Sequence, residues 1–328
     1  MAHVIRRLRE LDPGRRVAVR TEAPGWLFPS GVDVRAAEFD SGAVERCAAL
    51  RIDARATGGR LRALIRNRAE IAAREAAFLC MERAALVVAD VPFLAGEAAA
   101  AAGVPCIAIG NFTWDWIYEP LLDGGQDSPE LLGAVREGYG KMARFLRLPF
   151  GQTEGFEIFP RVTDVPLVAS VSRRETSEIL RDLGLTRDGR KRILIGMRGG
   201  VPRSILDRAA AAFPEVHFLE PGAVEFADLV KVSDAVVSKL GYGIAAACAA
   251  HATPLLYPPR HGFREDGVLE QQLRRCIPMR PITEERFLNG DWRSDLEALA
   301  GMEPSERQVP CDGDLVCAQI IRKTLNES

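Results

Sequence analysis

The chain has 328 residues, of which 47% are hydrophobic and 27% charged, with a net charge of −2 and a pI near 6.2. This composition is that of an ordinary globular protein and argues against a general nucleic-acid binder. No apolar run approaches the roughly 18 residues that a membrane span requires. The amino terminus lacks the apolar core of a signal peptide. We therefore expect a cytoplasmic protein of about two domains.

The first half predicts helices that alternate with strands. An amphipathic helix is expected over residues 2–11, strands over 16–20 and 32–39, and a long helix over 61–83. Two uninterrupted apolar runs, "ALVVADVPF" and "VPCIAIGNF", predict buried strands on either side of the small-residue helix "LAGEAAAAAG". Such strands indicate a parallel sheet that helices cover on both faces. A further helix is predicted over residues 129–147.

A proline- and glycine-rich stretch, "LPFGQTEGFEIFPRVTDVPLVA", has no clear period and predicts a domain boundary. After it the alternation restarts, with strands in "RILIGMRGG", "VHFLEPG", "SDAVVSK" and "TPLLYPP" and helices near 202–212, 224–231 and 265–275. The prediction is an α/β protein with domains at 1–155 and 156–328. The final helix, near 313–325, is expected to pack back on the first domain.

Two loops of the second half place glycines between a predicted strand and the start of a helix, in "GMRGG" and "SKLGYG". Glycine lets the backbone approach an anion closely, and a helix amino terminus offers unpaired N–H groups. A lysine adds a cation suited to phosphate. The alternative is that the glycines only permit tight turns, and neither loop has the spacing of a P-loop. The candidate diphosphate-binding residues are Arg198, Gly199, Gly200, Lys239, Gly241, Tyr242 and Gly243.

Polar residues follow other predicted strands, where doubly wound sheets bind ligands. Asp90 and Asn111 follow strands of the first half, and Asp115 lies among aromatic residues in "NFTWDWIYEP". That segment suits a cleft wall or, alternatively, an amphipathic helix with an aromatic core face. Arg264 and Glu265 begin a predicted helix, where the carboxylate could accept sugar hydroxyls or simply favour the helix dipole.

Neither a metal nor a cofactor is predicted. The seven cysteines include no CxxC pair, and no Cys/His cluster has zinc-ligand spacing. The four histidines give no defensible Ser/His/Asp arrangement. We expect reduced thiols and no structural metal.

Two segments in this order, "LVVADVPFLAGEAAAAAGVPCIAIGNFTWDWIYEP" and "DAVVSKLGYGIAAACAAHATPLLY…FREDGVLEQQL", resemble a GT-B-fold glycosyltransferase-like family. The nearest named relative is the amino-terminal glycosyltransferase-like module of L-arabinokinases. The second half more distantly resembles the peptidoglycan N-acetylglucosaminyltransferase and its glycosyltransferase-28 relatives. The resemblance covers nearly the whole chain.

The resemblance implies two Rossmann-like parallel-sheet domains that face each other across a cleft. Residues 1–155 would form the acceptor side, with Asp90, Asn111 and Asp115 near the cleft, and 156–328 would bind the nucleotide sugar. Members of this fold need no metal, because protein donors and helix ends carry the diphosphate charge. The family positions correspond to Gly199, Gly200, Lys239, Gly241, Gly243 and Glu265.

The sequence departs from the family at two places. Relatives carry a glutamate in the helix after the glycine loop, where it can bind the ribose, and this chain has Ala247. Relatives also begin with a strand and a Gly/His-rich loop whose histidine is a candidate base. Met1 corresponds to a point inside the helix after that loop, so His3 is the nearest imidazole and the candidate catalytic residue, although it does not match the loop histidine.

These departures lead to an expectation about the first sheet. The first strand of a doubly wound sheet is central, so its loss would leave a gap or wide groove between strand 16–20 and residues 86–89. Direct pairing of these two strands would instead mean a closed sheet. We expect the natural reading frame to start upstream with a strand and a Gly/His-rich loop, and an extension of roughly fifteen residues to raise stability, since each large buried apolar residue contributes about 1.5–3 kcal/mol.

Three functions remain open at this stage. The first is an inverting, metal-independent glycosyltransferase that uses a UDP-type sugar and an unknown acceptor. The second is a nucleotide-sugar-binding protein that has lost the chemistry, which Ala247 and the missing loop favour. The third is a nucleotide-sugar epimerase or hydrolase of the same architecture.

Overall fold

The computed structural model describes residues 1–328 except 47–49, 187, 198–200, 223, 304–308 and 328. The chain forms two compact units. The first consists of Met1–Val44, Asp53–Val168 and Asp312–Ser328, and the second of Glu45–Ile52 and Ala169–Cys311. Among the described residues, no helix is long and apolar enough to cross a membrane.

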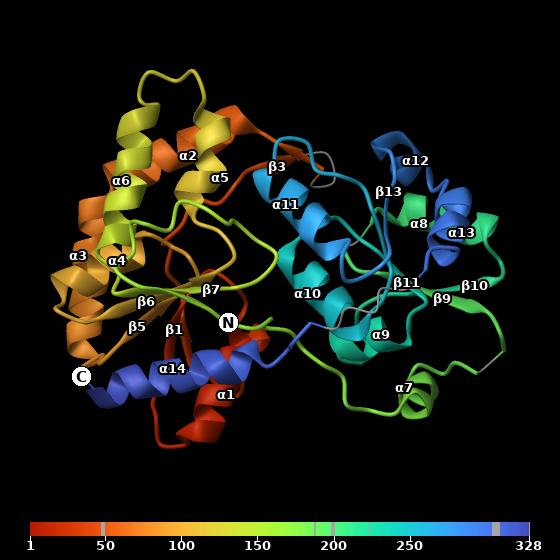
Figure 1. The fold of residues 1–328 in the computed structure, drawn as a ribbon, viewed down its shortest axis with the longest axis horizontal. Coiled ribbons are helices and arrows are strands. Elements are labelled where there is room, and N and C mark those ends of the chain that lie inside the picture. The colour runs from red at the N-terminus through yellow and green to blue at the C-terminus, as the bar shows by residue number, and fades with distance from the viewer. Residues whose placement is uncertain (47–49, 187, 198–200, 223, 304–308, 328) are drawn as a thin grey trace. The chain divides into compact units, whose positions relative to one another are not determined.

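The first unit contains a parallel four-stranded sheet in the order β5-β6-β7-β8 and a separate parallel pair, β1-β2 (Figure 1). The strands are β1 (Ala18–Arg20), β2 (Asp33–Arg35), β5 (Val87–Ala89), β6 (Cys106–Gly110), β7 (Arg144–Arg147) and β8 (Val162–Asp164). The helices are α1 (Ala2–Leu11), α2 (Ala54–Arg66), α3 (Arg68–Met81), α4 (Leu94–Ala101), α5 (Trp114–Leu122), α6 (Ser128–Gly140) and α14 (Gly313–Glu327).

Helices cover this sheet on both faces, as the uninterrupted apolar strands predicted. On one face, α1 and the carboxyl-terminal α14 lie together beneath β6 and β7 (Figure 1). Their contact is apolar and contains Val4, Leu8, Ile107, Cys317 and Ile321. On the other face, α4 contacts β5 and β6 and packs against α3 and α6. The last helix of the chain thus completes the core of the first unit.

A groove of about 920 Å³ lies between β1 and β5. Residues 16–21 line one side of it and residues 86–90 the other. Among the described residues, β1 pairs with β2 and β5 pairs with β6, so the two strands do not pair with each other. The groove expected beside residues 86–89 is therefore present, and the closed-sheet alternative is wrong.

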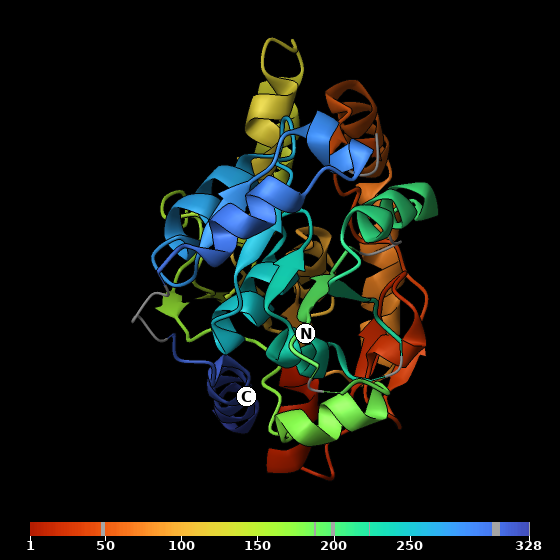
Figure 2. The same cartoon turned by 90° about the vertical axis from the view of Figure 1, so that its right-hand side faces the viewer.

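The second unit contains a parallel five-stranded sheet in the order β10-β9-β11-β12-β13. In Figure 2 its strands run through the middle of the unit with helices on both sides. The strands are β9 (Lys191–Ile195), β10 (Val216–Leu219), β11 (Ala235–Val237), β12 (Leu255–Tyr257) and β13 (Met279–Pro281). The helices are α7 (Thr176–Asp182), α8 (Arg203–Ala212), α9 (Phe226–Val232), α10 (Tyr242–His251), α11 (Arg264–Leu273), α12 (Glu284–Asn289) and α13 (Arg293–Ala300).

One face of the second sheet packs on α8, α12 and α13 in an apolar core around Trp292. Ala235 and Val237 of β11 face this core, and Leu50 from the amino-terminal half of the chain is also part of it. Leu50 lies between the short strands β3 (Glu45–Arg46) and β4 (Arg51–Ile52), which pair as an antiparallel hairpin. A segment distant in sequence therefore contributes a fully buried side chain to the second unit.

Two predicted helices have different boundaries in the structure. The helix predicted over 129–147 ends at Gly140, and residues 144–147 form β7 between β6 and β8. The backbone of "RFLR" pairs with strands on both sides, and this long-range pairing overrides the helical spacing of its apolar residues. The helix predicted over 61–83 is two helices, α2 and α3, which meet at Asn67. The aromatic segment after β6 forms α5, with Trp114 and Tyr118 buried, as its alternative interpretation stated.

The two units divide after Val168, whereas the sequence placed the boundary after residue 155. The difference arises because β8, within the intervening residues, pairs with β7 and so completes the first sheet. Helix α14 belongs to the first unit, where it packs against α1.

The close approach of α4 and α6 can be tested with two glycines. A Cβ added at Gly96 would lie 2.2 Å from the carbonyl oxygen of Gly138, whereas one added at Gly133 of α6 meets nothing within 4 Å. We expect Gly96→Ala to lower the free energy of unfolding by about 1–3 kcal/mol, the usual cost of overpacking. Gly133→Ala should raise it by about 0.5–1 kcal/mol because alanine favours the helix. Urea denaturation of both variants checks this, and equal effects would contradict the packing.

Candidate functional site

The strand order of the second unit fixes where a ligand is expected. In the order β10-β9-β11-β12-β13, the strand after β9 in the sequence, β10, lies on one side of β9, and the later strands β11, β12 and β13 lie on its other side. The strand order therefore reverses between β9 and β11. Ligands of doubly wound sheets bind outside the carboxyl ends of the strands at such a reversal. Here that place lies beyond Ile195 of β9 and Val237 of β11. The two glycine loops predicted from the sequence follow these two strands.

The loop after β11 joins the sheet to helix α10. The N–H of Gly196 donates to the carbonyl of Val237, so the ends of β9 and β11 remain paired up to the loop. The next residue, Ser238, is 1% exposed. Among the described residues, its hydroxyl has no hydrogen-bond partner. A buried hydroxyl in this state costs free energy that a bound polar group would recover.

The two glycines of this loop are not required by the fold. Gly241 precedes α10 with φ −174°, an extended conformation that any residue adopts. Gly243 lies in the first turn of α10, and a Cβ at either position would meet nothing within 4 Å. The interpretation that these glycines only permit a tight turn therefore has no support in the backbone. The surface at the start of α10 is open, as close approach of a ligand requires.

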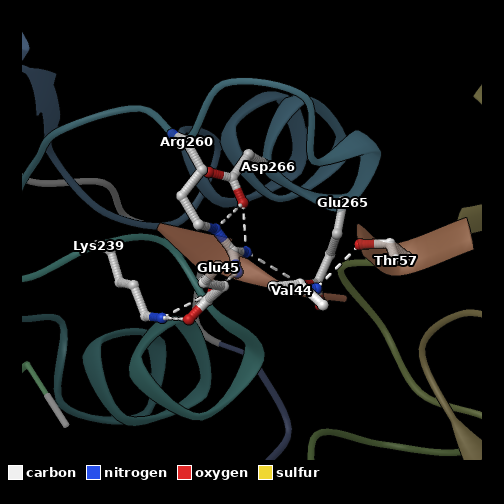
Figure 3. Close-up of polar contacts among 7 residues, drawn as sticks. All are labelled: Val44, Glu45, Thr57, Lys239, Arg260, Glu265 and Asp266. Carbon is white, nitrogen blue, oxygen red and sulfur yellow. Dashed lines mark hydrogen bonds and ion pairs between the residues drawn. The ribbon is translucent and has the colours of Figure 1, made fainter. Parts of the chain in front are cut away.

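Lys239 is bound to a carboxylate from the amino-terminal half of the chain (Figure 3). Its Nζ donates to both carboxylate oxygens of Glu45, at 2.8 and 2.7 Å. Arg260 also donates to Glu45, with 3.2 Å between Nη1 and Oε1. Glu45 lies on β3, which belongs to the second unit, so the whole cluster is part of that unit. The predicted phosphate-binding lysine thus already holds an anion.

Arg260 organises the acidic residues at the start of α11. Its side chain is 6% exposed, lies 4.0 Å from the ring centre of Phe263, and donates from Nε to Asp266 at 2.9 Å. Nη2 is 3.4 Å from Glu265 Oε2. Burial raises the pKa of Asp266 above its usual value, although the hydrogen bonds from Arg260 oppose the shift. Glu265, predicted to meet sugar hydroxyls, is buried in this cluster.

Five other residues of the second unit were predicted to bind the nucleotide sugar. Arg198, Gly199 and Gly200 lie outside the described residues. Tyr242 is the first residue of α10, and Arg264 is the exposed first residue of α11.

The acceptor-side residues lie apart in the first unit. Asp90 follows β5 and lines the groove. It is exposed, with 4.0 Å between its Oδ2 and the amino group of Met1. Asn111 is buried, and its amide donates to the carbonyl of Phe150 at 3.4 Å. Asp115 is also buried and accepts a hydrogen bond of 2.8 Å from Arg136 of α6. Asp90 is thus the one of these three that lines the groove.

His3 lies on α1, whose buried residues Val4, Ile5 and Leu8 line the groove. His3 itself is not among the described residues that line it.

The structure adds Asp40 to the acceptor-side candidates. Asp40 lines the same groove as Asp90, is partly buried, and accepts a 2.9 Å hydrogen bond from the N–H of Gly42. Burial raises its pKa to about 6, and the charge of Asp90 acts in the same direction. A carboxylate with a pKa near neutrality is suited to accept protons.

Sequence analysis missed Glu45, Arg260 and Asp40. Glu45 and Asp40 lie in segments without apolar periodicity, and the charged groups that act on them, Lys239 on Glu45 and Asp90 on Asp40, are distant along the chain. Arg260 had a usable signal, because it follows β12 at the same sheet edge as the glycine loops. Among the described residues, no group of three or more His, Cys, Asp or Glu side chains could hold a metal ion.

The chain is similar in sequence to a curated protein and in fold to several solved structures. No protein-family model matches the chain. L-arabinokinase of Arabidopsis thaliana is 27% identical over 351 residues, which cover 99% of this chain and 33% of that protein. The chain therefore spans about a third of the length of this curated relative.

Solved structures give the fold. The calicheamicin glycosyltransferase CalG4 superposes with a TM-score of 0.60 at 15% identity, over 99% of this chain and 90% of that one. The kitacinnamycin glycotransferase gives 0.62 at 14% identity, over 99% and 95%. The chain has the GT-B fold. The resemblance to GT-B-fold proteins and to L-arabinokinase predicted from the sequence is confirmed.

Another solved GT-B structure contains a nucleotide. The spinosyn rhamnosyltransferase SpnG, complexed with thymidine diphosphate, has a TM-score of 0.54 at 13% identity and matches 99% of this chain and 92% of that one.

The raised pKa of Asp40 predicts a pH-dependent stability. The pKa is about 6 in the fold and 3.8 for an isolated carboxyl. The carboxyl therefore stabilises the fold while protonated, and this contribution is lost as the pH rises through 6. Asp40→Asn should therefore raise the free energy of unfolding at pH 7.5 by about 1 kcal/mol, after allowance for solvent screening, and should have little effect at pH 4.

Urea denaturation of Asp40→Asn at the two pH values makes this measurement. The exposed Asp123, changed to asparagine in the same unit, is the matched control and should show no such difference. An equal gain for Asp40→Asn at both pH values would contradict the buried-carboxyl interpretation.

Proposed function

We propose that the chain is a glycosyltransferase that takes a UDP-type nucleotide sugar as donor, binds it at the loop after β11, and acts without a metal. The observation that carries the proposal is the position of Lys239. This cation lies beyond β11 at the reversal of strand order, next to an open helix start. The GT-B fold, which this chain shares with a SpnG structure that contains thymidine diphosphate, supports a nucleotide as ligand.

The proposed reaction is a direct displacement. The acceptor oxygen forms a bond to the anomeric carbon of the sugar, the bond from that carbon to the diphosphate oxygen breaks, and a base takes the acceptor proton. Negative charge then develops on the leaving diphosphate. The Lys239 ammonium and the N–H groups at the start of α10 stabilise that charge more in the transition state than in the ground state.

For the base, we propose Asp40 ahead of His3. Asp40 lines the groove beside Asp90 and has the raised pKa that a carboxylate base needs near neutral pH. His3 stays a candidate from the sequence. Exchange of each for a neutral residue, with transfer rate measured against pH, separates the two.

A second function is favoured by one residue. Ala247 is buried on α10 and 6% exposed, so the side chain that would bind the ribose in relatives is missing. This favours a nucleotide-sugar-binding protein without transferase activity. Assays that follow release of free UDP or TDP from their glucose conjugates, with and without a panel of acceptors, distinguish the two. Binding without release supports the second function.

Lys239 gives the first test of the donor site. UDP or TDP should raise the melting temperature of the parent protein, and Lys239→Ala should weaken nucleotide affinity by about tenfold, the effect of a charge-assisted contact. Lys191→Ala is the control, because Lys191 is exposed at the amino end of β9, the opposite end of the same sheet. Equal affinities for the parent and Lys239→Ala would remove Lys239 from the site. A parent that no nucleotide stabilises would overturn the donor site.

Gly243 gives a test in which stability and binding move in opposite directions. Gly243→Ala should raise the melting temperature of the free protein, because alanine in the exposed first turn of α10 contributes about 0.5–1 kcal/mol. The added methyl group lies where the diphosphate is proposed to contact the protein backbone, so UDP should raise the melting temperature of this variant by less. Gly133→Ala, an exposed helical glycine of the first unit, should gain stability and keep the UDP effect. A Gly243→Ala protein with full UDP stabilisation would contradict the proposed contact.

A further inference from the structure

The carboxylate that pairs with Lys239 belongs to Glu45, whose position in the chain is well defined. Glu45 lies on the hairpin β3–β4, and the described part of this hairpin belongs to the second unit, while the flanking Val44 and Asp53 belong to the first. The two flanks are held together by a 2.8 Å hydrogen bond from the Asp53 N–H to the Val44 carbonyl. Val44 is held in addition by Thr57, whose hydroxyl oxygen accepts its N–H at 2.9 Å (Figure 3).

Several contacts fix the hairpin on the second unit. Leu50 is fully buried in its core, and its carbonyl accepts a 2.8 Å hydrogen bond from the His261 N–H. Arg51 pairs with Glu284 of α12 at 2.8 Å, and this contact lowers the pKa of Glu284. These contacts position Glu45 and do not involve Lys239. The contact between Glu45 and Lys239 is therefore not needed to hold the hairpin in place.

The charges of the cluster divide into two groups. Arg260 is buried, and Asp266 and Glu265 lie against it, so its charge is compensated without Glu45. The Lys239 side chain is 21% exposed, and its ion-pair partner among the described residues is Glu45, which is 31% exposed. Removal of the Glu45 charge would leave Lys239 without this ion pair at the start of α10, with the more distant charge of Asp266 still acting on it.

We propose that Glu45 is an internal competitor for the anion site, an autoinhibitory contact in which its carboxylate occupies Lys239 until a diphosphate displaces it. This inference rests on the proposed function, because it takes the diphosphate of the donor as the displacing anion. Both carboxylate oxygens contact the lysine, as two phosphate oxygens would. The pair is half-exposed, so its free energy is small and a dianionic ligand can replace it.

The test is the affinity for UDP, measured by titration calorimetry for the parent and for Glu45→Gln, which keeps the shape of the side chain and removes its charge. Glu45→Gln should bind UDP about fivefold more tightly, the change in equilibrium constant that corresponds to a half-exposed ion pair. The difference should shrink as salt is added, because screening weakens the competing pair. Glu215→Gln, which removes a charge from an exposed ion pair with Arg293, is the matched control and should bind like the parent.

A double-mutant cycle completes the test. In the Lys239→Ala background, Glu45→Gln should have no effect on UDP affinity, because the contact is already lost. A gain of affinity that persists in this background would overturn the proposal. Equal affinity of the parent and Glu45→Gln would overturn it while leaving the donor site intact. If no variant binds UDP, both the donor site and the competition are overturned. Circular dichroism of each variant verifies folding.

Discussion

The pairing of β9 with β11 is the constraint on which the candidate site depends. These strands are separated along the chain by α8, β10 and α9, yet they are neighbours in the sheet. Parallel neighbours end at the same edge, so two loops that are distant in sequence begin side by side. One strand with its glycine-containing loop would form only one side of a binding site. Because β11 lies next to β9, the loops after both strands can contribute to the same site.

At this edge of the sheet the positive charge of Lys239 is paired with the carboxylate of Glu45. A partly exposed lysine next to a helix amino terminus attracts anions, and in the absence of ligand it can pair with a carboxylate within reach. The chain supplies its own carboxylate at a fixed place. In the proposed competition, one residue defines the resting state of the site, and ligands with more negative charge than a single carboxylate are favoured.

The sequence predicted the parts of the fold that local patterns encode. The strands β5, β6, β9, β11 and β12 were found because their apolar runs are uninterrupted, and the groove beside β5 was expected from the family resemblance. Residues 144–147 were assigned to a helix, but "RFLR" forms a strand because it pairs with β6 and β8. Such long-range pairing leaves no local pattern in the sequence. For the site, Lys239 was found by its place after a strand. Glu45 could not be found, because its role depends on a hairpin docked some two hundred residues away in the sequence.

The buried Leu50 has a consequence for how the protein can be divided. The second unit as a continuous fragment, residues 169–311, would lack a fully buried side chain from its core. Loss of a buried leucine side chain lowers the free energy of unfolding by about 2–5 kcal/mol, a large part of the stability of a domain. Evolutionary exchange of the nucleotide-side unit by simple recombination at Val168 would therefore transfer an incomplete module.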